Sequence, residues 1–208
     1  MRMAWLPMRP PETQAEITLD PSKMVLALGN PGPRYESTRH NVGWWVADRL
    51  AYDWDFGPFE LDESAAVTSG SVDAIAVEIR KPTVFMNRSG LAVADLARRE
   101  GFDVTDDLLV VVDDATLDVG RIRFRPSGGS GGHNGLRSVA GALGTNQYPR
   151  LRLGVGRCPE EVDLADWVLS EMGPEDEDVL VEALPELTQA VELWMYEGTE
   201  AAMNRFNR

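Results

Sequence analysis

The chain has 208 residues, of which 43% are hydrophobic and 26% are charged, a composition typical of one folded domain rather than a disordered chain. No apolar stretch approaches the ~20 residues that cross a bilayer, so no membrane-spanning segment is expected. The single cysteine, Cys158, excludes a disulfide framework and is typical of a reducing compartment. With only two histidines beside it, a structural zinc site is not expected.

The formal net charge is −14, which by itself argues against a nucleic-acid-binding protein. The distribution of charge favours the opposite, because residues 121–157 contain seven arginines and no acidic residue. Such a basic segment can attract a polyanion to one face of an otherwise acidic protein. Pairing of these arginines with acids elsewhere in the fold explains the same pattern, and composition does not decide between the two.

Residues 1–22 contain four prolines and no hydrophobic period. We therefore predict a flexible N-terminal arm at 1–22, followed by a single domain at 23–208. The arm lacks the basic and apolar regions of a secretory signal. Together with the unpaired cysteine, this predicts a cytoplasmic protein.

Strand-like and helix-like segments alternate after the arm. Short apolar or alternating runs predict strands at 24–29, 65–71, 73–80, 108–112, 121–125 and 151–156. Helical spacing predicts helices at 38–53, 91–101, 134–143, 163–170 and 174–204. Ser37 or Thr38 can cap the first helix, and Pro185 should kink or split the last. The alternation predicts a three-layer α/β domain with helices on both sides of a mixed, mainly parallel central sheet.

Open α/β sheets bind ligands in the loops that follow their strands, and four such loops here carry polar residues. They are 29–41, 85–87, 113–114 and 127–134. The last is glycine-rich, but it lacks the lysine of a phosphate-binding loop and the spacing of a dinucleotide-binding loop. Its place in the basic segment, directly before a predicted helix, would still let backbone N–H groups approach a ligand.

His40 is one of only two side chains in this chain that are suited to carry a proton at neutral pH. A carboxylate at a strand end, Asp113 or Asp114, can hold such a ring and stabilise its protonated form. No serine elbow occurs and Cys158 has no evident partner, so a histidine that activates water directly is left. A histidine that is merely satisfied near a helix start is the structural alternative.

Three asparagines, Asn30, Asn87 and Asn134, lie in the same loops. An asparagine amide offers both a donor and an acceptor without a charge. A set of them is suited to hold peptide groups and to stabilise a developing oxyanion. Each alone is an ordinary turn residue, and only their combination favours a binding site.

These loops and strand ends contain five ordered motifs. They read LGNPGPRYESTRHNVGWW, PTVFMNRSG, VVDD, GGHNGL and RLRLGVGR. Together they strongly resemble bacterial-type peptidyl-tRNA hydrolase, and the resemblance extends from about Met24 to Phe206. It implies a monomeric α/β enzyme that hydrolyses the ester joining a peptide to its tRNA, with no metal and no cofactor.

The resemblance also implies roles for individual residues. His40 is similar to the catalytic base, Asp113 to its supporting carboxylate and Asn30 to a neighbour that orients the site. The expected substrate-binding residues are Tyr35, Phe85, Met86, Asn87 and Asn134. Arg125 and Arg152 are similar to the basic clamp on the 5′-phosphate of tRNA.

One segment departs from the family pattern, in which an acidic residue and then Leu-Asp-Leu-Pro follow the catalytic aspartate. Here residues 115–118 read Ala-Thr-Leu-Asp after Asp114, which leaves open whether Asp113 or Asp114 faces His40. Two other functions are also compatible with the sequence. One is a non-catalytic RNA-binding protein on the same scaffold, and the other is a hydrolase of small esters or amides that does not bind RNA.

Overall fold

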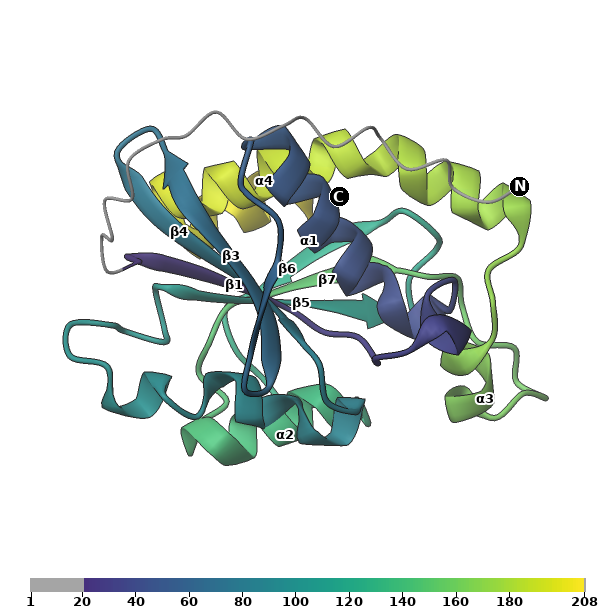
Figure 1. The fold of residues 1–208 in the computed structure, drawn as a ribbon. Coiled ribbons are helices and arrows are strands. Elements are labelled where there is room, and N and C mark those ends of the chain that lie inside the picture. Colours follow the sequence, from purple (N-terminus) through teal and green to yellow (C-terminus); the bar gives the residue numbers. More distant parts are fainter. Residues whose placement is uncertain (1–20, 208) are drawn as a thin grey trace.

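The computed structural model describes residues 21–207, so all but the end of the predicted arm at 1–22 lies outside the described residues. Seven strands form one sheet in the order β2-β3-β4-β1-β5-β7-β6 (Figure 1). Their bounds are β1 Lys23–Ala27, β2 Glu60–Asp62, β3 Ala65–Val72, β4 Ile75–Pro82, β5 Leu108–Asp114, β6 Ile122–Arg125 and β7 Arg150–Gly154.

The four central strands, β4, β1, β5 and β7, run parallel to one another, and antiparallel pairs complete both edges. The predicted α/β fold with a mixed sheet is therefore confirmed. All seven residues of β5 are buried, as is typical of a parallel strand that is covered on both faces. Because these strands are parallel, their carboxyl ends meet at one edge of the sheet.

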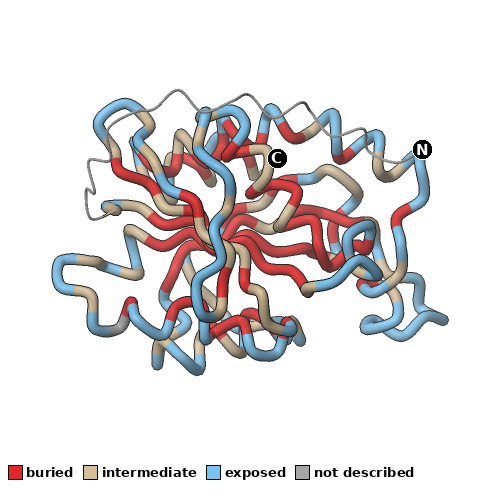
Figure 2. The backbone as a smooth tube through the Cα atoms, in the orientation of Figure 1, coloured by how far each residue is buried: buried red, intermediate tan, exposed pale blue. Residues whose placement is uncertain are grey.

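Helices cover both faces of the sheet. The α-helices are α1 Val42–Asp53, α2 Asn134–Leu143, α3 Leu164–Leu169 and α4 Pro174–Phe206, and the 3₁₀ helices are η1 Pro33–Tyr35, η2 Arg39–Asn41, η3 Met86–Val93 and η4 Leu96–Arg98. Helices α1 and α4 lie on one face, and α2 lies with η3 on the other (Figure 1). Figure 2 shows the buried strands between these exposed layers.

Side chains of each strand alternate between the two layers, which divides the core in two. In β5, Leu109 and Val111 join the core under α1 and α4, whereas Leu108 and Val110 join the core under α2. This alternation decides which layer each aspartate at the end of β5 faces.

No helix of the described residues has the length and apolar character needed to span a membrane.

The prediction of a helix at 91–101 is wrong, because this region forms the 3₁₀ helices η3 and η4. Two main-chain groups at the start of this region are bonded to other elements, and one of them, the Ala92 carbonyl, would be paired inside an α-helix. The Gly90 N–H donates to Ser138 Oγ at 2.9 Å, and the Ala92 carbonyl accepts from Arg80 Nη1 at 2.7 Å. Packing against α2 and β4 therefore overrides the helical period of the sequence.

Two further details of the helices also differ from the prediction. Neither Ser37 nor Thr38 caps α1, since the Thr38 hydroxyl donates to the Tyr35 carbonyl and α1 begins at Val42. Helix α4 continues through Pro185, and its non-helical residue is Gly198, with φ of 82°. Pro185 is exposed, so water can hydrate the carbonyl that loses its helical partner.

Candidate active site

The predicted loops meet at the carboxyl edge of the parallel strands. Asn30 follows β1, Met86 follows β4 and Asp113 lies at the end of β5. His40 comes from η2, directly before α1, where Gly43 packs tightly on the sheet. A Cβ on Gly43 would lie 2.4 Å from the Leu28 carbonyl oxygen. This close approach brings the start of α1, and with it His40, to the same edge.

His40 and Asp113 form a direct contact, with 2.7 Å between Nδ1 and Oδ1. Both are buried, with exposed fractions of 7% and 4%. Asp113 rather than Asp114 therefore contacts His40, which answers the question that the sequence left open. Because Nδ1–H donates to the carboxylate, Nε2 carries the free lone pair of the neutral ring. Among the described residues nothing hydrogen-bonds to this Nε2, so it can accept a proton from water.

A second histidine, His133, contacts the same oxygen and was not among the predicted site residues. Its Nε2 lies 3.1 Å from Asp113 Oδ1. Its Nδ1 accepts the backbone N–H groups of Gly135 at 3.1 Å and Leu136 at 3.3 Å, which caps the start of α2. Because Nδ1 is an acceptor, the ring proton lies on Nε2 and is donated to Asp113. The sequence signals were that it is the second of only two histidines and that it lies between the glycine run and the start of a helix.

The charge of Asp113 is set by these two rings. Burial by itself would raise the pKa of the carboxyl, but the charges and hydrogen bonds of His40 and His133 outweigh it and hold the pKa well below its ordinary value. Ligand atoms of the three side chains lie within 4.8 Å of one another, a spacing that a metal ion could also use. Both ring nitrogens that face the carboxylate are at hydrogen-bond distance from it. The absence of a metal from the reaction stays a prediction.

Asn30 joins three segments of the site. Its Oδ1 accepts the Met86 N–H at 2.8 Å, which ties the loop after β1 to the start of η3. Asn41, which was not among the predicted site residues, pairs with both main-chain groups of Asn30. Asn41 Oδ1 accepts the Asn30 N–H at 2.8 Å, and Asn41 Nδ2 donates to the Asn30 carbonyl at 2.9 Å. The side-chain amide nitrogen of Asn30, Nδ2, has no acceptor among residues 21–207, so it is left as a donor at the same edge of the sheet.

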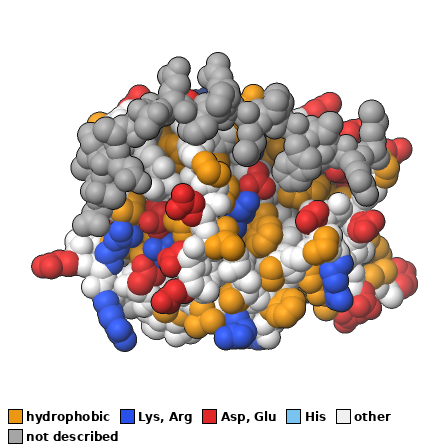
Figure 3. All heavy atoms as spheres, in the orientation of Figure 1, with side chains coloured by type: hydrophobic (Ala, Val, Ile, Leu, Met, Phe, Trp, Pro, Cys, Tyr) orange, Lys and Arg blue, Asp and Glu red, His pale blue; other side chains and the backbone are white. Residues whose placement is uncertain are grey.

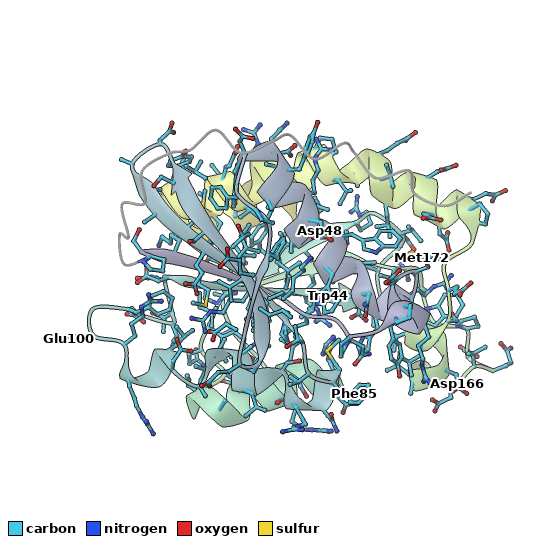
Figure 4. All side chains as sticks on the ribbon, viewed as in Figure 1. Trp44, Asp48, Phe85, Glu100, Asp166 and Met172 are labelled. Atoms are coloured by element: carbon cyan, nitrogen blue, oxygen red, sulfur yellow. The ribbon has the colours of Figure 1, made fainter. Side chains whose placement is uncertain are left out.

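The predicted substrate residues lie on η1, on η3 and directly before it, and at the start of α2. Phe85 is 57% exposed and projects away from the sheet at the start of η3 (Figure 4). Tyr35 meets it edge to face, with 6.4 Å between the ring centroids. Met86 is buried, while Asn87 is exposed on η3 and Asn134 is exposed at the start of α2. Because η3 packs along α2, these two asparagines lie on neighbouring elements.

The two predicted phosphate-binding arginines lie on the antiparallel strands β6 and β7. Arg125 is exposed, whereas Arg152 is partly buried with its Nε 3.0 Å from Asp114 Oδ2. Among the described residues, Arg152 and Arg157 are the only arginines of 121–157 that form ion pairs with an acid. Within residues 21–207, the other five arginines of the segment therefore have no acid at ion-pair distance. The face drawn in Figure 3 instead carries acidic and basic side chains interspersed.

An α/β sheet with a buried histidine–carboxylate pair at its carboxyl edge, and with no serine or cysteine bonded to that histidine in residues 21–207, is compatible with a hydrolytic enzyme that activates water. The chain belongs to the peptidyl-tRNA hydrolase family, whose model matches residues 24–208. This confirms the resemblance read from the motifs.

Individual relatives agree with this assignment. The peptidyl-tRNA hydrolase of Gemmatimonas aurantiaca is 44% identical over 190 residues, which cover 89% of this chain and 100% of the relative. That of Chloroflexus aggregans is 42% identical over 184 residues, or 88% and 98% of the two chains. The crystal structure of peptidyl-tRNA hydrolase from Acinetobacter baumannii superposes with a TM-score of 0.81 at 28% identity and covers 89% of this chain and 94% of that one.

Proposed function

We propose that His40 and Asp113 carry out the reaction of the family, hydrolysis of the ester bond between a peptide and its tRNA. Membership of the family makes the chain an enzyme that acts on this bond. The observation that supports the mechanism is the 2.7 Å contact between His40 Nδ1 and Asp113 Oδ1, which leaves Nε2 without a partner among the described residues.

In this mechanism His40 Nε2 takes a proton from a water molecule, and the water oxygen attacks the ester carbonyl carbon. The ionised Asp113 stabilises the imidazolium that forms. The amide of Asn30 or Asn87 donates to the oxyanion of the tetrahedral intermediate. When the intermediate collapses, the ribose oxygen leaves and takes its proton back from His40, which restores the neutral ring.

Substrate binding is divided between two sets of residues. We assign Asn87 and Asn134 to the peptide main chain, because an exposed amide can both donate and accept. We assign Tyr35, Phe85 and Met86 to the adjoining part of the substrate. Arg125 and Arg152 are proposed to bind the 5′-phosphate of tRNA, since guanidinium groups bind phosphate through two parallel hydrogen bonds. We further propose that the enzyme acts as a monomer in the cytoplasm and without a cofactor.

The test is release of tRNA from an N-acetylated aminoacyl-tRNA by the His40→Ala variant. We expect kcat to fall about 10²–10⁴-fold, the usual contribution of a general base. Binding of uncharged tRNA, measured in parallel, should stay unchanged because His40 is not part of the basic surface. Turnover close to that of the wild type would refute the assignment of the base. Binding of tRNA by a wild-type protein without any turnover would instead identify the non-catalytic alternative.

A further inference from the structure

Asp114 is a buried acid that the proposed mechanism does not use. Its side chain is 1% exposed. Its Oδ1 accepts two hydrogen bonds from Thr116, from the backbone N–H at 2.9 Å and from the hydroxyl at 2.7 Å. Its Oδ2 lies 3.0 Å from Arg152 Nε. These atoms form an ion pair in which the N–H is not directed at the oxygen.

Strand alternation sends Asp114 to the face of the sheet opposite to that of Asp113. On this face β6 and β7 present arginines, because Phe124 and Leu151 point into the core under α4. The four arginines are Arg123, Arg125, Arg150 and Arg152. In the antiparallel register Arg123 lies opposite Arg152 and Arg125 lies opposite Arg150. Like charges directly opposite each other are destabilising, so this face favours a bound anion.

The four arginines differ in what holds them. Arg150 is buried, and its guanidinium donates to the carbonyls of Gly128 at 2.8 Å, Gly129 at 3.1 Å and Asn146 at 3.0 Å, so it is occupied by the loops around it. Arg152 is the only one of the four with an acidic partner in the part of the chain that the structure describes.

The glycine-rich loop passes beside this face. Because β6 runs antiparallel to β7, the end of β6 lies beside the start of β7. The loop that follows β6 then runs back alongside β7 to the start of α2. Arg150 binds this loop at Gly128, and a Cβ on Gly131 would lie 4.0 Å from Arg152 Nη2. Gly131 is exposed and has a φ of 58°, a conformation that favours glycine. The outer end of Arg152 thus lies beside an exposed loop, while its Nε lies against the buried Asp114.

We propose that Asp114 is a positioning residue for tRNA binding, which holds Nε of Arg152 so that the two Nη groups face the 5′-phosphate beside the glycine-rich loop. The proposal rests on the proposed function and on the assignment of Arg152 to the phosphate. A fixed guanidinium loses less side-chain entropy when it binds a phosphate through its Nη groups. The two adjacent aspartates of β5 then serve different parts of the reaction. Asp113 holds the base, and Asp114 holds the group that binds RNA.

The experiment compares Asp114→Asn with the wild type on N-acetylated aminoacyl-tRNA, with and without its 5′-phosphate. The variant retains the size of the side chain and one oxygen for Thr116, but it loses the charge. We expect KM to rise about tenfold on the phosphorylated substrate, the effect of one charge-assisted contact, with kcat within about twofold of the wild type. On the dephosphorylated substrate the two enzymes should have the same KM. Thr116→Val, which removes one hydrogen bond to the same carboxylate without changing its charge, should leave KM unchanged.

A second variant, Arg152→Lys, keeps the positive charge and removes the Nε group that lies against Asp114, so it tests the same ion pair without a substitution at Asp114. It should raise KM as Asp114→Asn does, and the double variant should be no worse than either single one. An unchanged KM in both variants, additive effects, or an equal loss on the dephosphorylated substrate would overturn the role of Asp114. A wild-type enzyme that releases no tRNA would refute the proposed function instead, and that result is separate from these comparisons.

Discussion

The substitution Asp113→Asn tests the electrostatic role of the carboxylate most directly. Both histidine N–H groups meet the same oxygen, Oδ1, at 2.7 Å and 3.1 Å. An asparagine oxygen can occupy this place and keep both rings oriented, so the main change is loss of the negative charge. Since His40 becomes positively charged in the transition state, the substitution removes the attraction between that charge and Asp113.

The size of the effect follows from the geometry. Charge centres about 4 Å apart interact by about 4 kcal/mol at an effective dielectric constant of ~20. A barrier higher by this amount lowers kcat roughly 10³-fold. The assay is single-turnover hydrolysis of N-acetylated aminoacyl-tRNA, with the folded state of the variant verified by thermal unfolding.

Asp107→Asn serves as the matched control, because Asp107 precedes the same strand and pairs with Lys23 at 2.9 Å far from the site. Its kcat should stay within about twofold of the wild type. A folded Asp113→Asn enzyme that loses less than about threefold in kcat would refute the assigned role of Asp113.

Two further predictions concern stability. Gly43→Ala should destabilise the fold by roughly 1–3 kcal/mol in urea unfolding, because its Cβ would lie 2.4 Å from the Leu28 carbonyl oxygen. Gly141→Ala in α2 has nothing within 4 Å of its Cβ, so it should stabilise the fold by roughly 0.5–1 kcal/mol. Equal effects of the two substitutions would contradict the packing argument. The folded pKa of Asp113 lies below its ordinary value of 3.8, so its ionised form contributes stability that is present above about pH 4 and lost on further acidification. The difference in unfolding free energy between the wild type and Asp113→Asn should therefore shrink from about pH 6 to about pH 3, and a constant difference would argue against the shift.

Six of the seven strands and most of the helices could be predicted from the sequence because their signals are local, whereas the short, exposed strand β2 was missed. The continuous apolar run of β5 and the helical period of α2 appear in the structure at nearly the predicted bounds. The prediction failed for η3 and η4, where the decisive hydrogen bonds come from Ser138 and Arg80, residues that are distant in the chain. Pro185 does not split α4, since the cost of a proline in a helix depends on whether the unpaired carbonyl is exposed to water.

For the site, the sequence by itself determined which chemical groups are present and their order, because the motifs around His40, Asn30 and the glycine-rich loop are each contiguous. Only the tertiary structure decided which partner each group meets. Adjacent residues of a strand face opposite layers, so Asp113 and Asp114, alike in sequence, reach different partners. His133 joins the site only because the loop between β6 and α2 runs alongside β7 toward the carboxyl edge of the sheet. Such contacts between distant segments depend on strand register and packing, which the sequence encodes only through the whole fold.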